Sequence, residues 1–195
     1  MSDAVGAERA VFGFPGVGGY RRQDGSIRYV EITQQPTTVG RAGGREEKAH
    51  RLLKSAGFRI ALSDDIETWL KAHMVFITAL ESAIAAAGGD SRLLSRDAGR
   101  VREMVLAIRE RFASLEHIGA RVAPATLRTI FMSLPVSIAS FYWRGQLRGD
   151  LGTVAIAPRV RITLHTELRA LQRDVRTMLA SGPATPRLDR LIGGR

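Results

Sequence analysis

The spacing of apolar residues divides the chain into a short N-terminal part with strand-like runs and a longer part with helical periodicity. Up to residue 62, apolar residues occur in brief runs separated by glycine and proline, which is typical of strands and turns. The predicted elements are strands at 10–14, 26–33, 37–40 and 58–62 and a helix at 46–56. They are too few for a complete doubly wound sheet, so residues 1–62 are predicted to form an incomplete α/β segment.

From residue 63 onward, apolar positions recur every three or four residues, which is the period of one face of an α-helix. The first helix is predicted to start after Asp64, because Asp64 and Glu67 form a capping box. Its apolar stripe contains Ile66, Trp69, Leu70, His73, Ile77, Leu80 and Ile84. Further helices are predicted at about 97–117, from Pro124 to about 132, from Pro135 through Trp143, and from Pro158 to Leu179. Residues 63–195 therefore predict an all-helical domain, and the fold class is mainly α.

Two glycine-rich segments, 13–19 and 40–44, invite comparison with phosphate-binding loops. Gly16 and Gly18 have the first spacing of a dinucleotide fingerprint, but Arg21 stands at the third position. No helical pattern follows, and the chain has no Gly-Lys-Ser/Thr sequence. We therefore predict that both segments are loops between other elements rather than phosphate sites.

The composition excludes several classes of protein. The chain has no cysteine, which excludes disulfide scaffolds, Cys-ligated zinc and thiol nucleophiles. The four histidines stand far apart without metal-like spacing, so no metal site is expected. No apolar run approaches the length of a membrane span, and the start of the chain lacks a signal-peptide pattern. The expected location is the cytoplasm, without a membrane partner.

The formal net charge is +10, and all basic residues except Lys48, Lys54 and Lys71 are arginines. This charge indicates either an anionic partner, such as nucleic acid or a phosphorylated cofactor, or simply a compositional preference for arginine. The arginines are scattered and form no run of five or six, which argues against a nucleic-acid partner.

Two residues of the first long helix are candidates for chemistry. His73 lies on the apolar stripe, where a buried and hydrogen-bonded core histidine is the ordinary outcome. Lys71 is the one lysine of the helical part, two residues after Trp69. It is either a surface lysine that covers apolar neighbours or a group selected to share or donate a proton.

The segment Ser63–Lys71 resembles the start of the helical domain of the ketopantoate reductases, which carry Asp-Ile and then Trp-x-Lys on the first long helix after the nucleotide-binding domain. The preceding strands and the 46–56 helix resemble the end of that domain. The late helix followed by Gly182 and Thr185-Pro186 also resembles the family. The resemblance covers roughly residues 10 to 192.

This resemblance implies a helical domain of the 6-phosphogluconate dehydrogenase C-terminal type and a role in the NADP-dependent reduction of a small 2-oxo acid, in pantothenate biosynthesis. Lys71 would be the catalytic lysine that donates to the carbonyl oxygen. Glu167, in the Thr166-Glu167-Leu168 sequence, would be the second catalytic residue. A separate Rossmann chain or a homodimer would be the partner.

The chain also departs from the family pattern. Val75 and Ala79 stand where the family has asparagines, and the Gly-x-Gly-x-x-Gly fingerprint is absent. Three functions therefore remain: the substrate-binding and dimerisation part of a reductase that is inactive alone, a non-catalytic helical interaction module, and a basic nucleic-acid binder. The kept Trp69-x-Lys71 favours the first, the lost asparagines favour the second, and the scattered arginines disfavour the third.

Overall fold

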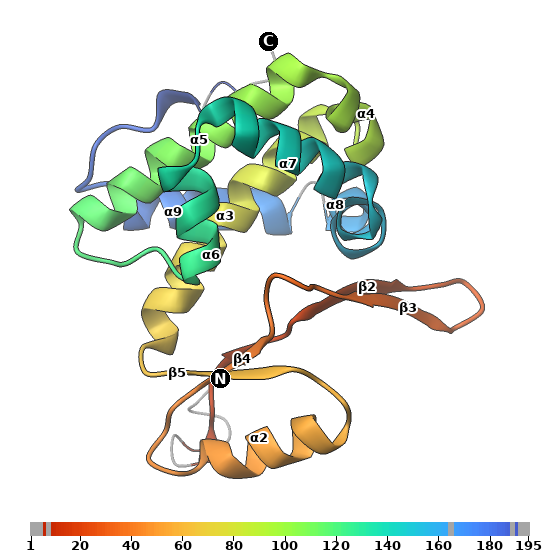
Figure 1. Ribbon diagram of the computed structural model, residues 1–195, viewed down its shortest axis with the longest axis vertical. Helices are drawn as coiled ribbons and strands as arrows, with labels where there is room; N and C mark the ends of the chain where they lie inside the picture. Colours follow the sequence, from red (N-terminus) through yellow and green to blue (C-terminus); the bar gives the residue numbers. More distant parts are fainter. Residues whose placement is uncertain (1–5, 7–8, 164–165, 188–189, 191–195) are drawn as a thin grey trace.

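Two small sheets and a helical bundle make up the computed structural model, which describes residues 6, 9–163, 166–187 and 190 (Figure 1). Most of the described residues lie in helices, which confirms the prediction of a mainly α fold. The sheet segment lies at one end of the molecule and the bundle at the other, and helix α3 connects them.

The first sheet has the strand order β1-β4-β5. Its strands are β1 (Gly13–Phe14), β4 (Thr37–Gly40) and β5 (Ile60–Ser63), and helix α2 (Glu46–Ser55) connects β4 to β5. Strand β1 pairs antiparallel with β4, whereas β4 and β5 are parallel. Gly57, with φ +90°, follows α2 and ends it, because a left-handed backbone is easy only for glycine. A parallel β-α-β unit is thus present, as the incomplete α/β segment predicts.

The second sheet is the hairpin β2–β3, formed by Val17–Arg21 and Ile27–Glu31. The prediction of a loop throughout 13–19 was wrong here, because β2 begins at Val17. Glycine-rich β2 has little strand propensity of its own, and its pairing with β3 is what makes it a strand. The turn is confined to Pro15 and Gly16, whose N–H donates to Thr37 Oγ1 at 2.9 Å. A Cβ at Gly16 would lie 2.5 Å from the carbonyl oxygen of Gln35, so only glycine fits.

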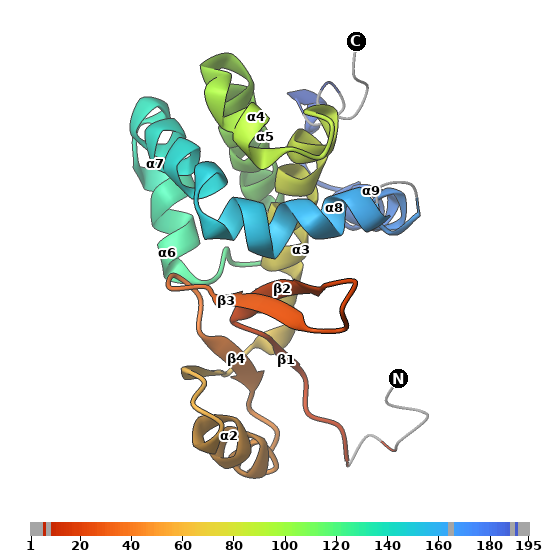
Figure 2. The same ribbon diagram turned by 90° about the vertical axis from the view of Figure 1, so that its right-hand side faces the viewer.

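The hairpin lies against the helical bundle, as the second view shows (Figure 2). Strand β2 contacts the π-helical segment η3 (Leu151–Ile156). A Cβ placed on Gly18 would lie 2.5 Å from Cβ of Ala155, so the two backbones approach as closely as small side chains allow.

Helix α3 (Ile66–Ala86) begins directly after β5 and runs into the bundle (Figure 1). The predicted N-cap, Asp64, was wrong by one residue: the side chain of Asp65 accepts a hydrogen bond from Thr68 N at 2.9 Å. Asp64 instead pairs with Arg41 at 2.7 Å and is turned away from the helix end. Asp65 therefore satisfies one of the free N–H groups at the start of α3.

The remaining helices surround α3. They are α4 (Ser91–Arg96), α5 (Ala98–His117), α6 (Ala125–Arg128), π-helical η2 (Thr129–Ser133), α7 (Val136–Arg148), α8 (Ala157–Thr163) and α9 (Glu167–Met178). Asp97 caps α5, so this helix starts one residue after the predicted start. The single helix predicted from Pro158 to Leu179 is two helices, α8 and α9, and residues 164–165 between them lie outside the described part. The predicted final turn, 187–192, also falls largely outside it.

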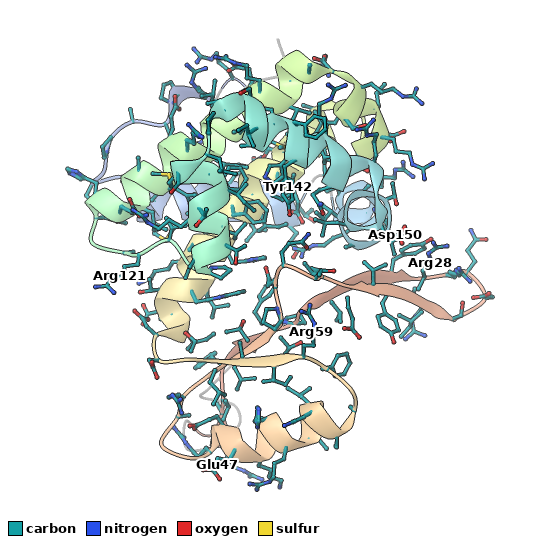
Figure 3. The ribbon with its side chains drawn as sticks, viewed as in Figure 1. Arg28, Glu47, Arg59, Arg121, Tyr142 and Asp150 are labelled. Carbon is teal, nitrogen blue, oxygen red and sulfur yellow. The ribbon has the colours of Figure 1, made fainter. Side chains whose placement is uncertain are left out.

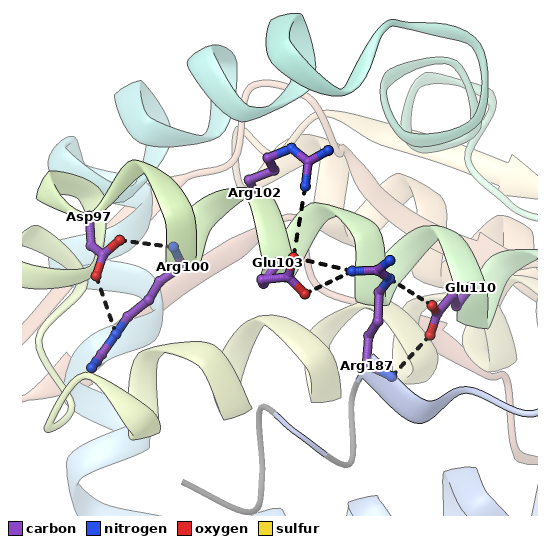
Figure 4. A network of polar contacts seen from close by, with 6 residues as sticks. All are labelled: Asp97, Arg100, Arg102, Glu103, Glu110 and Arg187. Atoms are coloured by element: carbon purple, nitrogen blue, oxygen red, sulfur yellow. Dashed lines mark hydrogen bonds and ion pairs between the residues drawn. The ribbon is translucent and has the colours of Figure 1, made fainter. Parts of the chain in front are cut away.

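Ion pairs of one arginine, Arg187, join the C-terminal segment after α9 to α5 (Figure 4). Arg187 Nη1 contacts Glu103 Oε2 at 2.9 Å, and its Nε contacts Glu110 Oε1 at 2.8 Å. Glu103 and Glu110 lie two turns apart on α5, so this arginine holds the segment along the helix.

Candidate functional site

A cavity of about 120 Å³ lies where the hairpin and the loop after it meet the helical bundle. Its walls come from β1, β2, residues 32–35, α3, α6, α7, η3 and α8. Most of the lining is apolar, with Phe76, Ile77, Leu127 and Leu151 as examples. Small-molecule sites are commonly apolar hollows with a few polar groups that orient the ligand. The polar residues of this lining therefore determine what the cavity could bind.

His73 contributes a buried imidazole to the cavity wall. Its ring is stacked on Trp69, with centroids 5.3 Å apart and planes 5° from parallel, and it also contacts Phe14 at 4.0 Å. Burial, together with a smaller contribution from the charge of Arg159, lowers the pKa of His73 to about 4. The imidazole is therefore neutral at pH 7. The prediction of a buried histidine is confirmed. The predicted hydrogen bond is wrong for Nδ1, which has no partner among the residues that the structure describes.

An ion-pair cluster lies at another part of the lining. Glu81 of α3 is 2% exposed, and its Oε1 lies 3.6 Å from Arg159 Nε. Burial raises the pKa of the Glu81 carboxyl, whereas the Arg159 charge lowers it and Glu167 raises it again. Arg159 Nη2 also donates to Glu167 Oε1 at 2.8 Å. One arginine thus faces two carboxylates, and its charge is already compensated.

Hydrogen-bonding groups complete the polar part of the lining. Gln34 Nε2 donates to Gln146 Oε1 at 3.4 Å. Tyr142, labelled in Figure 3, forms a hydrogen bond with Gln34, while its partial burial raises the pKa of its phenol. Arg59 holds the chain just before these glutamines, because its Nη2 donates to the carbonyls of Ile32 and Thr33 at 2.9 and 3.0 Å (Figure 3).

Three lining residues hold buried nitrogens that have no hydrogen-bond partner in the part of the chain that the structure describes: Gln35 Nε2, His73 Nδ1 and Trp143 Nε1. Buried polar atoms are nearly always hydrogen-bonded in folded proteins. These three nitrogens have almost no accessible surface, so they lie behind the wall of the cavity rather than on it.

Lys71 does not line this cavity. Its Nζ pairs with Glu67 Oε1 at 2.7 Å on the surface of α3, and its side chain is 41% exposed. Lys71 and His73 are two residues apart, which places them about 200° apart around the helix. One and two turns after Lys71, Val75 and Ala79 are fully buried in the core, so no polar surface continues from the lysine along this face.

The structure does not bring Lys71 and Glu167 together. Glu167 is the first residue of α9 and lies beside Arg159, close to the Glu81 end of the cavity. Lys71 precedes Glu81 by ten residues on α3, or about 15 Å along the helix axis. A small 2-oxo acid is shorter than that separation, so the two predicted catalytic residues contact different parts of the molecule.

Most of the polar residues that line the cavity were not predicted from the sequence. Glu81 did carry a signal, because it is the single charged residue in the helix segment between Met74 and Ala87. Gln35 and Arg159 carried none, since each reaches the cavity through the fold of a distant segment.

The N-terminus of α2 lies inside the parallel β4-α2-β5 unit, where a nucleotide phosphate would be expected. Glu46 Oε2 accepts hydrogen bonds there from Ala42 N at 2.7 Å and from Gly44 N at 3.0 Å. These backbone donors are thus taken by a carboxylate, which would also repel a pyrophosphate. The N-terminus of α2 therefore does not fit a pyrophosphate.

Among the described residues, no group of three or more histidine and carboxylate side chains could hold a metal ion. Within the same part of the chain, no helix has the length and apolar character needed to cross a membrane. Comparison with family models, curated proteins and solved structures found no match for this chain.

Proposed function

We propose that this chain is the substrate-binding and dimerisation part of a reductase for a small 2-oxo acid, with a helical domain of the 6-phosphogluconate dehydrogenase C-terminal type. In this proposal NADP is held by a nucleotide-binding domain on a separate Rossmann chain, the reaction takes place in the cytoplasm, and the described chain is inactive alone. The misfit of α2 for a pyrophosphate is the reason to assign the cofactor elsewhere.

The observation that carries the proposal is the path of the chain from β4 to α3. A parallel β4-α2-β5 unit ends at Ser63, and Lys71 lies about one and a half turns into the helix that leaves the sheet. Ligands of open α/β sheets bind outside the carboxyl ends of the parallel strands. Lys71 thus lies on the side of the molecule where an added nucleotide-binding domain would bring its substrate.

In this function, Lys71 donates a hydrogen bond to the carbonyl oxygen of the 2-oxo acid. The ammonium stabilises the negative charge that develops on that oxygen during reduction, and it can supply the proton. Substrate binding would have to displace Glu67 from Lys71 Nζ, which is feasible because surface ion pairs contribute little. Glu167 has a different task here: it holds Arg159.

The first sheet also supports a partner. Strand β5 pairs with β4 alone among the described strands, so its other edge is open. Open edges pair readily with further strands. A separate Rossmann chain or a second copy of this chain would cover that edge.

The test is 2-oxo-acid-dependent oxidation of NADPH by this chain mixed with the nucleotide-binding domain of a ketopantoate reductase. We expect activity in the mixture and a loss of about 100- to 1,000-fold or more in Lys71→Ala. Lys54→Ala, an exposed lysine on α2, is the matched control and should keep the full rate.

The second candidate function is a non-catalytic interaction module of the same fold. The burial of Val75 and Ala79 and the pairing of Lys71 with Glu67 favour it. Equal rates in wild type and Lys71→Ala would remove the lysine from the mechanism. A mixture that forms a stable complex and binds NADPH but reduces no 2-oxo acid would establish the second candidate in place of the first.

A further inference from the structure

We propose that the cavity between the hairpin and the bundle binds a small, uncharged, mostly apolar molecule that carries a carbonyl or hydroxyl oxygen. This site is independent of the proposed reduction, because Lys71 does not line it.

The volume sets the size of the ligand. The cavity measures about 120 Å³. An apolar cavity of about 150 Å³ in another protein holds benzene. The ligand is therefore a compound of about six non-hydrogen atoms.

The charges of the lining exclude an ionic ligand. Arg159 is the cation among the described lining residues at pH 7, and it already faces Glu81 and Glu167. A carboxylate ligand would lie near both of those carboxylates and would have to compete with them for the arginine. A cationic ligand would be repelled by Arg159 and would lose its hydration among apolar walls. A neutral molecule meets neither cost.

Gln34 and Tyr142 set the chemistry of the polar end, because both line the cavity and are only partly buried. The unpartnered nitrogens of Gln35, His73 and Trp143 have almost no accessible surface, so they do not reach the ligand. A phenol and a side-chain amide each offer a hydrogen-bond donor. A carbonyl or hydroxyl oxygen on the ligand can accept from them. Apolar side chains such as Phe76, Ile77 and Leu151 suit the rest of the ligand.

The indole protons give a direct readout of this site. The chain has two tryptophans: Trp143 lines the cavity, and Trp69 does not. In a two-dimensional ¹H–¹⁵N spectrum of the full chain, the two indole N–H signals are assigned by Trp69→Phe. A ligand in the cavity contacts the side chain of Trp143 and shifts its indole signal, and it leaves the signal of Trp69 nearly unchanged.

The probes are three compounds of equal heavy-atom number at pH 7: 3-methyl-2-butanone, isobutyrate and 3-methyl-2-butylamine. We expect the ketone to shift the Trp143 signal saturably, with a dissociation constant of about 1 mM. Isobutyrate and the amine should bind at least about tenfold more weakly. Ile77→Phe should abolish the ketone effect by filling the cavity, whereas Ile138→Phe, the same exchange at an exposed position of α7, should not.

Tighter binding of isobutyrate or of the amine would overturn the assignment of an uncharged ligand. No saturable shift with any probe would show that the cavity holds water alone and would overturn the site itself. Equal shifts of both indole signals would identify a general solvent effect and count against the site as well. The indole titrations need no nucleotide-binding domain. A negative reductase assay therefore does not count against this site, and a negative ketone titration does not count against the proposed reduction.

Discussion

Two faces of the same helix carry the two candidate sites, and they differ in almost every physical respect. The Lys71 face is exposed at the sheet end of α3, and its charge is balanced by a neighbour one turn away on the same helix. The face with His73 and Glu81 is buried, and its charge is balanced by Arg159 from α8, 78 positions later in the chain than Glu81. The first site is local and the second depends on the tertiary fold.

This difference explains where perturbed ionisation occurs. His73 and Glu81 have shifted pKa values because burial removes water from the charged form of each group. Functional sites often contain such groups, although structural ion pairs shift pKa values as well. The buried face is therefore the part of α3 where mutation and pH should have large effects, and the exposed face is the part where only activity should respond.

The largest effect on stability is expected from Arg159→Leu. This change leaves the buried Glu81 carboxylate without its cation, which should lower the free energy of unfolding by about 3 kcal/mol at pH 8. That value is at the lower end for a broken buried pair, because Arg159 is partly exposed. The cost should shrink as the pH falls and Glu81 is protonated. Urea unfolding at pH 8 and pH 5 measures both quantities.

Arg173→Leu, at an exposed position of α9, is the control for Arg159→Leu and should cost little. If the two variants lose equal stability, the Glu81–Arg159 contact does not distinguish the buried face.

The next effect is the pH dependence that His73 contributes. Its folded pKa of about 4 is below the ordinary histidine pKa of 6.5, so the unfolded chain binds the proton first as the pH falls. Stability should decrease by about 2 kcal/mol between pH 7 and pH 5 and reach its full loss below pH 4. His73→Phe should lack this contribution.

Denaturant unfolding of wild type and His73→Phe across pH 7 to 5 makes this comparison. Glu81 acts with the opposite sign, because its raised pKa contributes stability that is lost as the pH rises. The difference between the two proteins isolates the histidine, and parallel curves would show that His73 is not buried in its neutral form.

A smaller effect is expected at the start of α3, which both faces share. Asp65→Ala removes the side chain that accepts from Thr68 N, and it should lower Tm by about 3 °C. Asp64→Ala should change Tm by less than half of that, because Asp64 makes only a surface pair with Arg41. Thermal unfolding followed by circular dichroism measures both changes in Tm. A larger loss of Tm in Asp64→Ala than in Asp65→Ala would identify Asp64 as the N-cap.

The smallest effect on stability is expected for Lys71→Ala. Loss of an exposed ion pair with Glu67 should change the free energy of unfolding by less than about 0.5 kcal/mol. Urea unfolding measures this directly. A loss above about 2 kcal/mol would mean that Lys71 is a structural residue, and any rate change in Lys71→Ala would then need a different interpretation.

Local patterns predicted much of the fold. The apolar stripe from Ile66 to Ile84 matches α3 to within two residues, and the predicted helix 46–56 matches α2 to within one. Strand β2 was missed because Gly18 and Gly19 have low strand propensity, and only the partner strand β3 makes this segment extended. The predicted late helix is divided because α8 and α9 each pack separately against α3, which periodicity alone does not reveal.

The candidate sites divide in the same way. Lys71 could be found from the sequence, because it is the one lysine of the helical part, where the other basic residues are arginines and histidines. The cavity could not, because Gln35 and Trp143 are more than 100 positions apart and have no shared motif. Whether Lys71 and Glu167 act together also depended on tertiary structure, since their distance is set by how α9 meets α3.

The contact between Gly18 and Ala155 has an evolutionary consequence. Strand β2 and η3 touch through the smallest side chains available, and one wall of the cavity depends on that contact. In homologous sequences a larger residue at position 18 should therefore occur together with glycine at position 155. Where both positions carry larger side chains, the hairpin must lie further from the bundle. The cavity should then have a different shape, and such homologues should bind different ligands.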